Sequence, residues 1–170
     1  MTPLDEALTI LAAGRSLDAS QAYGAVGAIM TGHASEAAIA SFLTALQVKG
    51  ETAAELAGAV QAVREHMAPL EGKFPPLLDT CGTGGDGANT LNISTAAAVV
   101  VAACGVAVAK HGNRSATSRS SSATVLAELG VAYDLEPADC ARCLLELGIT
   151  FLFAPRFHPA MRFAAPVRQV

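Results

Sequence analysis

The sequence predicts a small all-helical segment followed by an α/β region built on a parallel sheet. Up to about residue 68, apolar residues recur at the spacing of one helix face. The adjacent prolines Pro75 and Pro76 then mark a break that a helix does not cross. Beyond them, short apolar runs alternate with amphipathic stretches, which is the element order of a parallel α/β sheet.

Four helices are expected in the first segment. They cover Leu4–Ala13, Ser20–Met30, Glu36–Gln47 and Ala53–Met67. The last of them follows Thr52-Ala-Ala-Glu55, a capping-box pattern in which the threonine and glutamate side chains bond backbone N–H groups at the helix start. We therefore predict a helical domain over residues 1–68 and a linker over 69–76.

Strands and helices are expected to alternate over residues 77–154. In order along the chain they are strand Leu77–Thr80, helix Ser94–Cys104, strand Val106–Lys110, helix Ser122–Leu129, helix Pro137–Leu147 and strand Ile149–Phe153. Because a helix carries the chain back between strands, this order favours parallel pairing.

Composition limits the partners that we expect. Hydrophobic residues make up 52% of the chain but aromatic residues only 5%, which suits closely packed helices on a parallel sheet. The formal net charge of −4 gives no broad basic field, so neither nucleic acid nor a membrane is an expected partner.

Cysteine usage favours a reducing compartment. The four cysteines are too few and too irregularly spaced for a disulfide framework, so we expect a cytoplasmic protein. Cys140 and Cys143 form a C-x-x-C pair within a helical pattern. No second thiol pair or nearby histidine completes a zinc site, and we interpret the two thiols as core or boundary residues.

A glycine-rich loop follows the first predicted strand. Its residues, Asp79-Thr-Cys-Gly-Thr-Gly-Gly-Asp-Gly87, lead a few positions later into the helix that starts near Ser94. Glycines let the backbone approach a ligand and present N–H groups to it, and a helix N-terminus adds partial positive charge. The loop therefore predicts phosphate or pyrophosphate binding.

Two other kinds of glycine loop fit less well. Gly82, Gly84 and Gly87 match G-x-G-x-x-G, but dinucleotide-binding folds also need an acidic residue at the end of the next strand. That strand ends here in Lys110 and His111, and a cation suits a second phosphate better than a ribose diol. No Lys-Ser or Lys-Thr follows the glycines, so the loop is not a Walker motif.

A polar stretch, Lys110-His-Gly-Asn-Arg-Ser-Ala-Thr-Ser118, follows the second predicted strand. It places cations and hydroxyls at the carboxyl end of a strand, where α/β sheets bind ligands, although a solvated loop would also explain its polarity. Because the two loops follow successive strands, we expect them to converge on one anion. Asn92 and Ser94, at the helix start between them, fit either a cap or a ligand contact, and Thr95 alone fits an ordinary N-cap.

With these motifs the chain resembles the anthranilate phosphoribosyltransferase family. The family's glycine loop, Asn-Ile-Ser-Thr and Lys-His-Gly-Asn-Arg-Ser occur at residues 82–86, 92–95 and 110–115, and further similarity extends over the whole chain. The resemblance implies a nucleoside phosphorylase/phosphoribosyltransferase-like fold with dimerisation through the helical domain. It also implies an α/β domain that binds phosphoribosyl pyrophosphate over 77–154, and a helix over 155–170 that returns to the helical domain.

The resemblance further implies which residues hold each substrate. Phosphoribosyl pyrophosphate would be held by Gly82, Gly85, Asp86, Thr90, Asn92, Ile93, Ser94, Thr95, Lys110, His111, Gly112, Asn113, Arg114, Ser115, Ala116, Thr117, Ser118 and Ser122. Anthranilate would meet Gly82, Asn113 and Arg168, whose guanidinium matches a planar carboxylate. Ser94 would also lie near Mg²⁺, the implied cofactor. No residue is assigned as catalytic, and His111 fits a proton-transfer or a loop-orienting role.

The implied reaction transfers the phosphoribosyl group from phosphoribosyl pyrophosphate to anthranilate, giving N-(5-phosphoribosyl)anthranilate and pyrophosphate in tryptophan biosynthesis. The expected partners are these two small molecules and a second copy of the chain. Two alternatives stay open at this point. One is a non-catalytic or inactive fragment or paralogue that binds phosphoribosyl pyrophosphate, and the other is a nucleoside phosphorylase of related fold.

Three features depart from the family's pattern. Ser121 stands where glycine is usual, and Thr124 stands where an acidic residue is usual. A serine would misplace the phosphate loop if position 121 has a positive φ. The chain also stops at Val170, before the family's second half and its acidic magnesium ligands. We therefore expect a truncated form of the fold, as a fragment, a split chain or a decayed relative.

Overall fold

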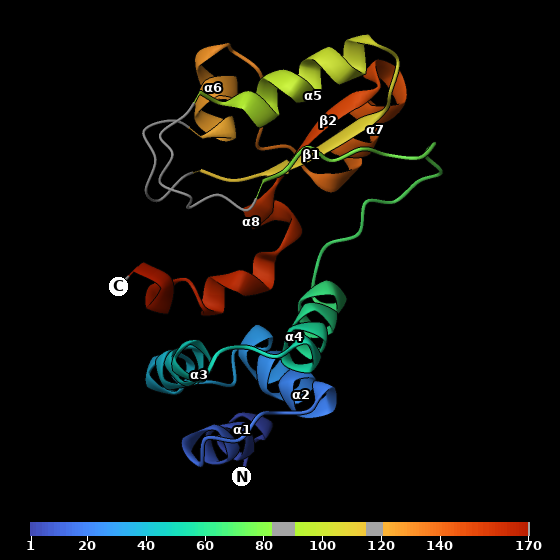
Figure 1. The fold of residues 1–170 in the computed structure, drawn as a ribbon. Helices are drawn as coiled ribbons and strands as arrows, with labels where there is room; N and C mark the ends of the chain where they lie inside the picture. The colour runs from blue at the N-terminus through green and yellow to red at the C-terminus, as the bar shows by residue number, and fades with distance from the viewer. Residues whose placement is uncertain (83–90, 115–120, 170) are drawn as a thin grey trace. The chain divides into compact units, whose positions relative to one another are not determined.

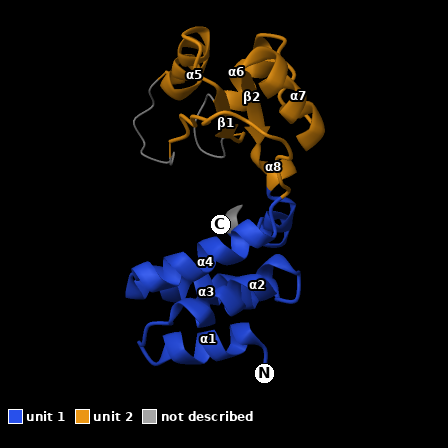
Figure 2. Cartoon of the chain, turned by 90° about the vertical axis from the view of Figure 1, so that its right-hand side faces the viewer, with its two compact units in different colours: residues 1–67, 158–170 blue, residues 68–157 orange. Residues whose placement is uncertain are grey.

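The chain folds as two units, one helical and one containing a sheet. The computed structural model describes residues 1–82, 91–114 and 121–169, with backbone only for 168 and 169. Residues 1–67 and 158–170 form the first unit, and residues 68–157 form the second (Figure 2). A helical domain followed by an α/β region with parallel strands was the predicted fold class, and it is confirmed.

Four helices make up most of the first unit. They are α1 (Pro3–Ala12), α2 (Ala19–Met30), α3 (Glu36–Lys49) and α4 (Ala53–Glu65). Capping boxes at Thr2, Asp18 and Thr52 fix the starts of α1, α2 and α4, and the last of these was predicted. Their apolar faces enclose one core, in which Phe42 and Ile39 of α3 are the largest fully buried side chains.

The backbones of α2 and α4 approach each other closely at Gly58. A Cβ atom at this position would lie 2.1 Å from the carbonyl oxygen of Ala19 and 2.9 Å from the backbone nitrogen of Tyr23. The neighbouring core positions Ala25 and Ala62 are fully buried. The high content of small apolar residues is therefore used, as composition suggested, to bring helices close together.

The C-terminal stretch differs from its prediction. Instead of one helix over 155–170, the structure has α8 (Ala154–Phe157) and two 3₁₀ helices, η1 (Pro159–Phe163) and η2 (Pro166–Gln169). Pro159 and Pro166 lack the N–H that a continuous helix needs, so each begins a new short helix. Ala160 and Ala164 of this stretch join the core of the first unit.

The second unit is built on two parallel strands, β1 (Val108–Gly112) and β2 (Ile149–Phe153). They pair in register from Val108 opposite Ile149 to Gly112 opposite Phe153. The helices of this unit are α5 (Ile93–Ala103), α6 (Ser122–Glu128), α7 (Pro137–Leu147) and α8, and Figure 1 shows α5 and α7 running beside the strands. In the described residues, the predicted strand Leu77–Thr80 is only a single parallel bridge between Leu78 and Val108.

Two glycines lead helices directly into these strands. Gly105, with a φ of 88°, follows α5, and Gly148, with a φ of 73°, ends α7 in the left-handed conformation. β1 begins two residues later than predicted, because all five residues from Val108 onward pair with β2, whereas Val106 is 45% exposed. The shift places Lys110 at the middle of β1 and Gly112 at its carboxyl end.

Among the described helices, none is long and apolar enough to cross a membrane.

Candidate functional site

Asp79 joins the start of the glycine loop to the end of β1. Its Oδ1 accepts a hydrogen bond from the backbone N–H of Cys81 at 2.8 Å and another from the backbone N–H of His111 at 3.2 Å. Nδ1 of His111 lies 4.0 Å from the Cys81 thiol. Gly82, the last residue of the glycine loop that the structure describes, is thereby held near the polar stretch. Asp79 was not a predicted site residue, although an acidic side chain just before the glycines was visible in the sequence.

Hydroxyl groups join the N-termini of α5 and α6. Oγ1 of Thr95 lies 2.7 Å from Oδ1 of Asn92 and 2.9 Å from Oγ of Ser122. Thr95 has one hydroxyl hydrogen and the amide oxygen can only accept, so Thr95 donates to Asn92 and accepts from Ser122. Thr95 is more than an ordinary N-cap, because it connects two of the predicted ligand-binding segments.

The first turn of α5 is also tied to the strand-like segment before the glycine loop. The Thr80 hydroxyl donates to the carbonyl oxygen of Ser94 at 2.8 Å. Ile93, the first residue of the helix, is 65% exposed. Backbone N–H groups of a first helical turn have no partner within the helix, so this end of α5 is suited to an anion.

Lys110 is buried within β1, with 4% of its surface exposed. Its Nζ lies 3.4 Å from the carbonyl oxygen of His111, which is a weak hydrogen bond. Among the described carboxylates, none pairs with this ammonium, whereas Lys49 pairs with Glu55. Burying an ammonium group without an anionic partner is costly, so a bound anion would stabilise this arrangement.

Gly112 lets the end of β1 pass closely beside β2 and α6. A Cβ atom there would meet the Phe151 ring at 2.7 Å and the Cβ of Ser122 at 3.4 Å. The next residue, Asn113, accepts a hydrogen bond from the backbone N–H of Arg114 through Oδ1 at 2.8 Å. The Asn113 side chain thereby fixes the backbone just after the end of β1.

Arg114 packs against two aromatic side chains of the second unit. Its Nη2 hydrogen-bonds to the hydroxyl of Tyr133, and its guanidinium carbon lies 5.6 Å from the Tyr133 ring centre and 6.0 Å from that of Phe153. The hydrogen bond that Arg114 donates to the Tyr133 hydroxyl raises the pKa of Arg114, which therefore stays charged. Sequence reasoning missed Tyr133, because it lies between helices at a position that no motif marks.

Ser121 occupies a position that does not require glycine. Its φ is −117° and its ψ is 164°, which is extended backbone, so the positive φ that would misplace the loop is absent. Its Oγ accepts from the backbone N–H of Thr124 at 3.1 Å and lies 2.7 Å from the Thr124 hydroxyl. The two residues that depart from the family's pattern thus cap α6 together.

The remaining predicted site residues are outside this geometry. Seven of them lie outside the described residues: Gly85, Asp86, Thr90, Ser115, Ala116, Thr117 and Ser118. Arg168 belongs to η2 of the first unit, where only its backbone is described. The described members of the predicted phosphate set all belong to the second unit: Gly82, Asn92, Ile93, Ser94, Thr95, Lys110, His111, Gly112, Asn113, Arg114 and Ser122.

Thiols and acidic groups of the described residues form no metal centre. No group of three or more histidine, cysteine, aspartate or glutamate side chains is arranged to hold an ion there. All four cysteines are unpaired. Burial raises the pKa of the Cys140 thiol, which points its Sγ toward the carbonyl oxygen of Phe151 at 3.5 Å. Cys140 is a core residue of the second unit, in line with the interpretation of the C-x-x-C pair.

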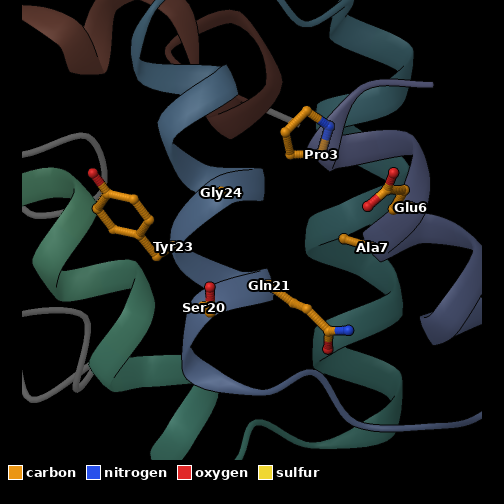
Figure 3. A pocket seen from close by; sticks show the side chains of 7 residues that line it. All are labelled: Pro3, Glu6, Ala7, Ser20, Gln21, Tyr23 and Gly24. Atoms are coloured by element: carbon orange, nitrogen blue, oxygen red, sulfur yellow. The ribbon is translucent and has the colours of Figure 1, made fainter.

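Two surface cavities lie elsewhere. One of about 290 Å³ in the helical unit is lined by Pro3, Glu6, Ala7, Ser20, Gln21, Tyr23 and Gly24 (Figure 3). The other, of about 630 Å³, is lined by Ala68, Pro69, Glu71, Glu136, Pro137, Ala138 and Ala141. Neither lining includes a basic side chain or a predicted site residue, so neither suits a phosphate.

Comparison with known families finds matches for both the helical and the α/β part of the chain. A model described as "Glycosyl transferase family, a/b domain" matches residues 74–170, which is more than half of the chain, and the family's "helical bundle domain" matches residues 5–67. The chain belongs to this glycosyl transferase family.

Individual members of the glycosyl transferase family that resemble this chain carry one name. The chain is 56% identical to "Anthranilate phosphoribosyltransferase" of Thermomicrobium roseum over 158 residues, which is 92% of this chain and 45% of the relative. It is also 52% identical to the protein of that name from Symbiobacterium thermophilum, over 94% of this chain and 47% of the relative. The resemblance inferred from the motifs is confirmed. The chain spans about half the length of the curated relatives that it matches.

Solved structures show the same similarity. The anthranilate phosphoribosyltransferase of Thermus thermophilus superposes with a TM-score of 0.89 at 46% identity, covering 99% of this chain and 50% of that one. The enzyme of Saccharomyces cerevisiae in complex with PRPP and Mg superposes with a TM-score of 0.88 at 28% identity, covering 98% of this chain and 50% of that one.

Proposed function

We propose that this glycosyltransferase chain binds phosphoribosyl pyrophosphate as part of an anthranilate phosphoribosyltransferase of tryptophan biosynthesis. The observation that carries the proposal is the buried ammonium of Lys110, which has no carboxylate partner among the described residues. It lies on the strand that Asp79 links to the glycine loop. The relatives' names and the PRPP complex of the yeast relative support this substrate.

The reaction needs positioning and charge stabilisation more than proton transfer. The amine nitrogen of anthranilate forms a bond to the anomeric carbon of the ribose as the bond from that carbon to the pyrophosphate oxygen breaks. The amine is already a free nucleophile, so a strong general base is not required, and the proton that the nitrogen loses after bond formation can pass to solvent. Pyrophosphate leaves with the bonding electrons, and the Lys110 ammonium and backbone N–H groups of the first turn of α5 would stabilise its charge.

Each substrate is assigned its residues within this proposal. The phosphoribosyl pyrophosphate set is the one implied by the resemblance, including those of its members that lie outside the described residues. Asn113, Gly82 and Arg168 are proposed for anthranilate, because amide and guanidinium groups match a carboxylate. Thr95 and Ser122 are proposed to hold the two helix starts in place, since their hydroxyls join α5 to α6.

Magnesium is proposed as the cofactor, supported by the Mg in the yeast relative's complex. Mg²⁺ prefers oxygen ligands and commonly keeps several waters while it binds substrate phosphates, so it does not need a cage of protein side chains. The Ser94 hydroxyl, in the first turn of α5, offers one such oxygen. When bound, the ion would neutralise charge on the pyrophosphate.

We further propose that residues 1–68 form a dimerisation domain. Several large apolar side chains of α3 and α4 are exposed, namely Leu43, Val48, Leu56 and Val60. A second copy of the chain would cover such side chains. A cytoplasmic location is proposed as well, because the four cysteines are unpaired.

Two measurements on this chain test the proposed function. Calorimetric titration of phosphoribosyl pyrophosphate with magnesium measures binding, and loss of anthranilate fluorescence measures turnover. Binding with turnover is expected of a competent transferase, whereas binding without turnover identifies the non-catalytic alternative. Absence of binding contradicts the proposal, and phosphate-dependent cleavage of a nucleoside would identify a phosphorylase instead.

A further inference from the structure

Tyr133 and Phe153 fix the guanidinium of Arg114 from a part of the fold outside every phosphate-binding motif. Nη2 of Arg114 donates a hydrogen bond to the Tyr133 hydroxyl, and both rings lie within cation–π range of the guanidinium carbon. The two rings also contact each other edge to face, with centres 5.4 Å apart and planes at 86°. Each of the three side chains thus limits the rotamers of the other two.

The segment that carries Tyr133 is itself held in place. Arg156 of α8 forms ion pairs with Asp134 through Nε at 2.6 Å and with Glu136 through Nη1 at 2.5 Å. Exposed ion pairs of this kind contribute little stability, but two of them from one guanidinium define the path of the connection between α6 and α7. Phe153 is the last residue of β2 and pairs with Gly112. Tyr133 is therefore a defined support and not a loop residue in passing contact.

We propose that Tyr133 is a positioning residue that pre-organises Arg114 for the anionic part of phosphoribosyl pyrophosphate. The inference rests on the proposed function, which places Arg114 among the residues that hold this substrate. A guanidinium carries five N–H donors, and the Tyr133 hydroxyl engages Nη2 only, so other donors stay available to phosphate oxygens. An arginine already fixed on aromatic rings loses less conformational freedom when it binds an anion.

The size of the effect follows from the freedom that Arg114 regains. Replacing Tyr133 by phenylalanine removes the hydrogen bond but keeps the ring, so the dissociation constant should rise about threefold. Replacing it by leucine removes the ring as well, and the constant should rise about tenfold. Because Tyr133 acts through Arg114, neither change should matter once Arg114 is replaced by alanine.

A double-mutant cycle measured by calorimetric titration of phosphoribosyl pyrophosphate with magnesium tests this inference. It compares wild type, Tyr133→Phe, Tyr133→Leu, Arg114→Ala and the two double variants, with thermal unfolding recorded for each. Tyr23→Phe is the matched control, because the Tyr23 hydroxyl also bonds a charged side chain, Glu65 at 2.6 Å, but in the helical unit. This control should bind like wild type.

The outcomes separate the inference from the proposed function. Weaker binding by the Tyr133 variants that disappears in the Arg114→Ala background is the expected result. Wild-type affinity or tighter binding in these variants would overturn the inference while leaving the function intact. The same loss in both backgrounds would also overturn it, since Tyr133 would then act independently of Arg114. If wild type itself does not bind, the proposed function fails and the inference fails with it.

Discussion

The hydroxyl of Ser122 donates a hydrogen bond to Oγ1 of Thr95 across 2.9 Å, and it thereby joins the first turn of α6 to the first turn of α5. Thr95 is buried, and its own hydroxyl donates a hydrogen bond to Oδ1 of Asn92 at 2.7 Å. This relay connects the Asn-Ile-Ser-Thr motif to the residues that follow the polar stretch. It would hold the two motifs together around the proposed ligand.

Replacing Thr95 by valine should weaken the proposed site at this relay. Valine keeps the shape but leaves the oxygens of Asn92 and Ser122 without their shared partner, at a cost of about 1–2 kcal/mol in the free energy of unfolding. Affinity for phosphoribosyl pyrophosphate should fall by about tenfold, because both helix starts lose their fixed spacing. Chemical denaturation and calorimetry check the two effects.

Thr9→Val provides the comparison for this variant. Thr9 is exposed in α1, where its hydroxyl donates only to the carbonyl oxygen of Asp5 at 2.9 Å. Its replacement should leave the affinity unchanged. Equal affinities for Thr95→Val and wild type would show that the relay does not shape the site.

Gly58→Ala should destabilise the helical unit. The added methyl group would meet the carbonyl oxygen of Ala19 at 2.1 Å, so α2 and α4 must separate, at a cost of about 1–3 kcal/mol. Gly27→Ala is the matched control, because a Cβ atom there meets nothing within 4 Å. With better helix propensity, that variant should gain up to about 1 kcal/mol. Thermal unfolding followed by circular dichroism measures both, and a stable Gly58→Ala would refute the close approach.

Glu55 should make the helical unit sensitive to acid. Burial raises the pKa of this carboxyl, but hydrogen bonds from the backbones of Leu17 and Thr52 and from Lys49 outweigh burial and lower the pKa from 4.5 to about 2. Because folding lowers the pKa of Glu55, the charged carboxylate stabilises the folded protein at pH values above its ordinary pKa. That stability should be lost as the pH falls from about 4.5 toward about 2.

Glu55→Gln tests this linkage. At neutral pH it should cost about 2 kcal/mol, because the buried N–H of Leu17 and the ammonium of Lys49 lose a charged acceptor. The variant should also lose less stability than wild type on acidification over the same pH range. Glu51→Gln, at an exposed position nearby, should follow wild type. Parallel acid-unfolding curves for Glu55→Gln and wild type would argue against the assignment.

Ser121 should act as a helix cap and not as an obstacle to the phosphate loop. Ser121→Ala should lower the free energy of unfolding by about 1 kcal/mol, and Ser121→Gly by only a few tenths, since glycine is a tolerated cap. Neither change should raise the affinity for phosphoribosyl pyrophosphate. A large gain in affinity for Ser121→Gly would mean that serine does disturb the loop.

Local patterns were sufficient to predict most of the helices. The N-cap at Thr52 and the apolar spacing of Pro137–Leu147 depend on neighbours in the sequence, and the structure has both as expected. Strand limits were less accurate, because β1 extends to wherever β2 offers a partner, and that partner is about forty residues away. The prolines that divide the stretch from 155 to 170 were visible in the sequence, but the expectation of one helix there came from the family resemblance.

The candidate site was predictable in its motifs and not in its supports. Asp79, which bonds the N–H of His111, and Tyr133, which bonds Arg114, act across 32 and 19 residues of sequence. No local signal distinguishes such residues from ordinary loop positions, since their partners are chosen by the tertiary fold. Glu55 is intermediate, because its capping role was visible but its bond to Leu17 was not.

A titration of phosphoribosyl pyrophosphate into Lys110→Met measures whether the buried ammonium of Lys110 binds the anionic substrate. Methionine retains the length of the side chain without its charge, and Lys73→Met, at an exposed lysine, is the control. We predict that the affinity of Lys110→Met falls by about a hundredfold or more, as expected for a lost buried charge–phosphate contact, while Lys73→Met binds like wild type. An unchanged affinity in a folded Lys110→Met protein would show that Lys110 does not bind the substrate.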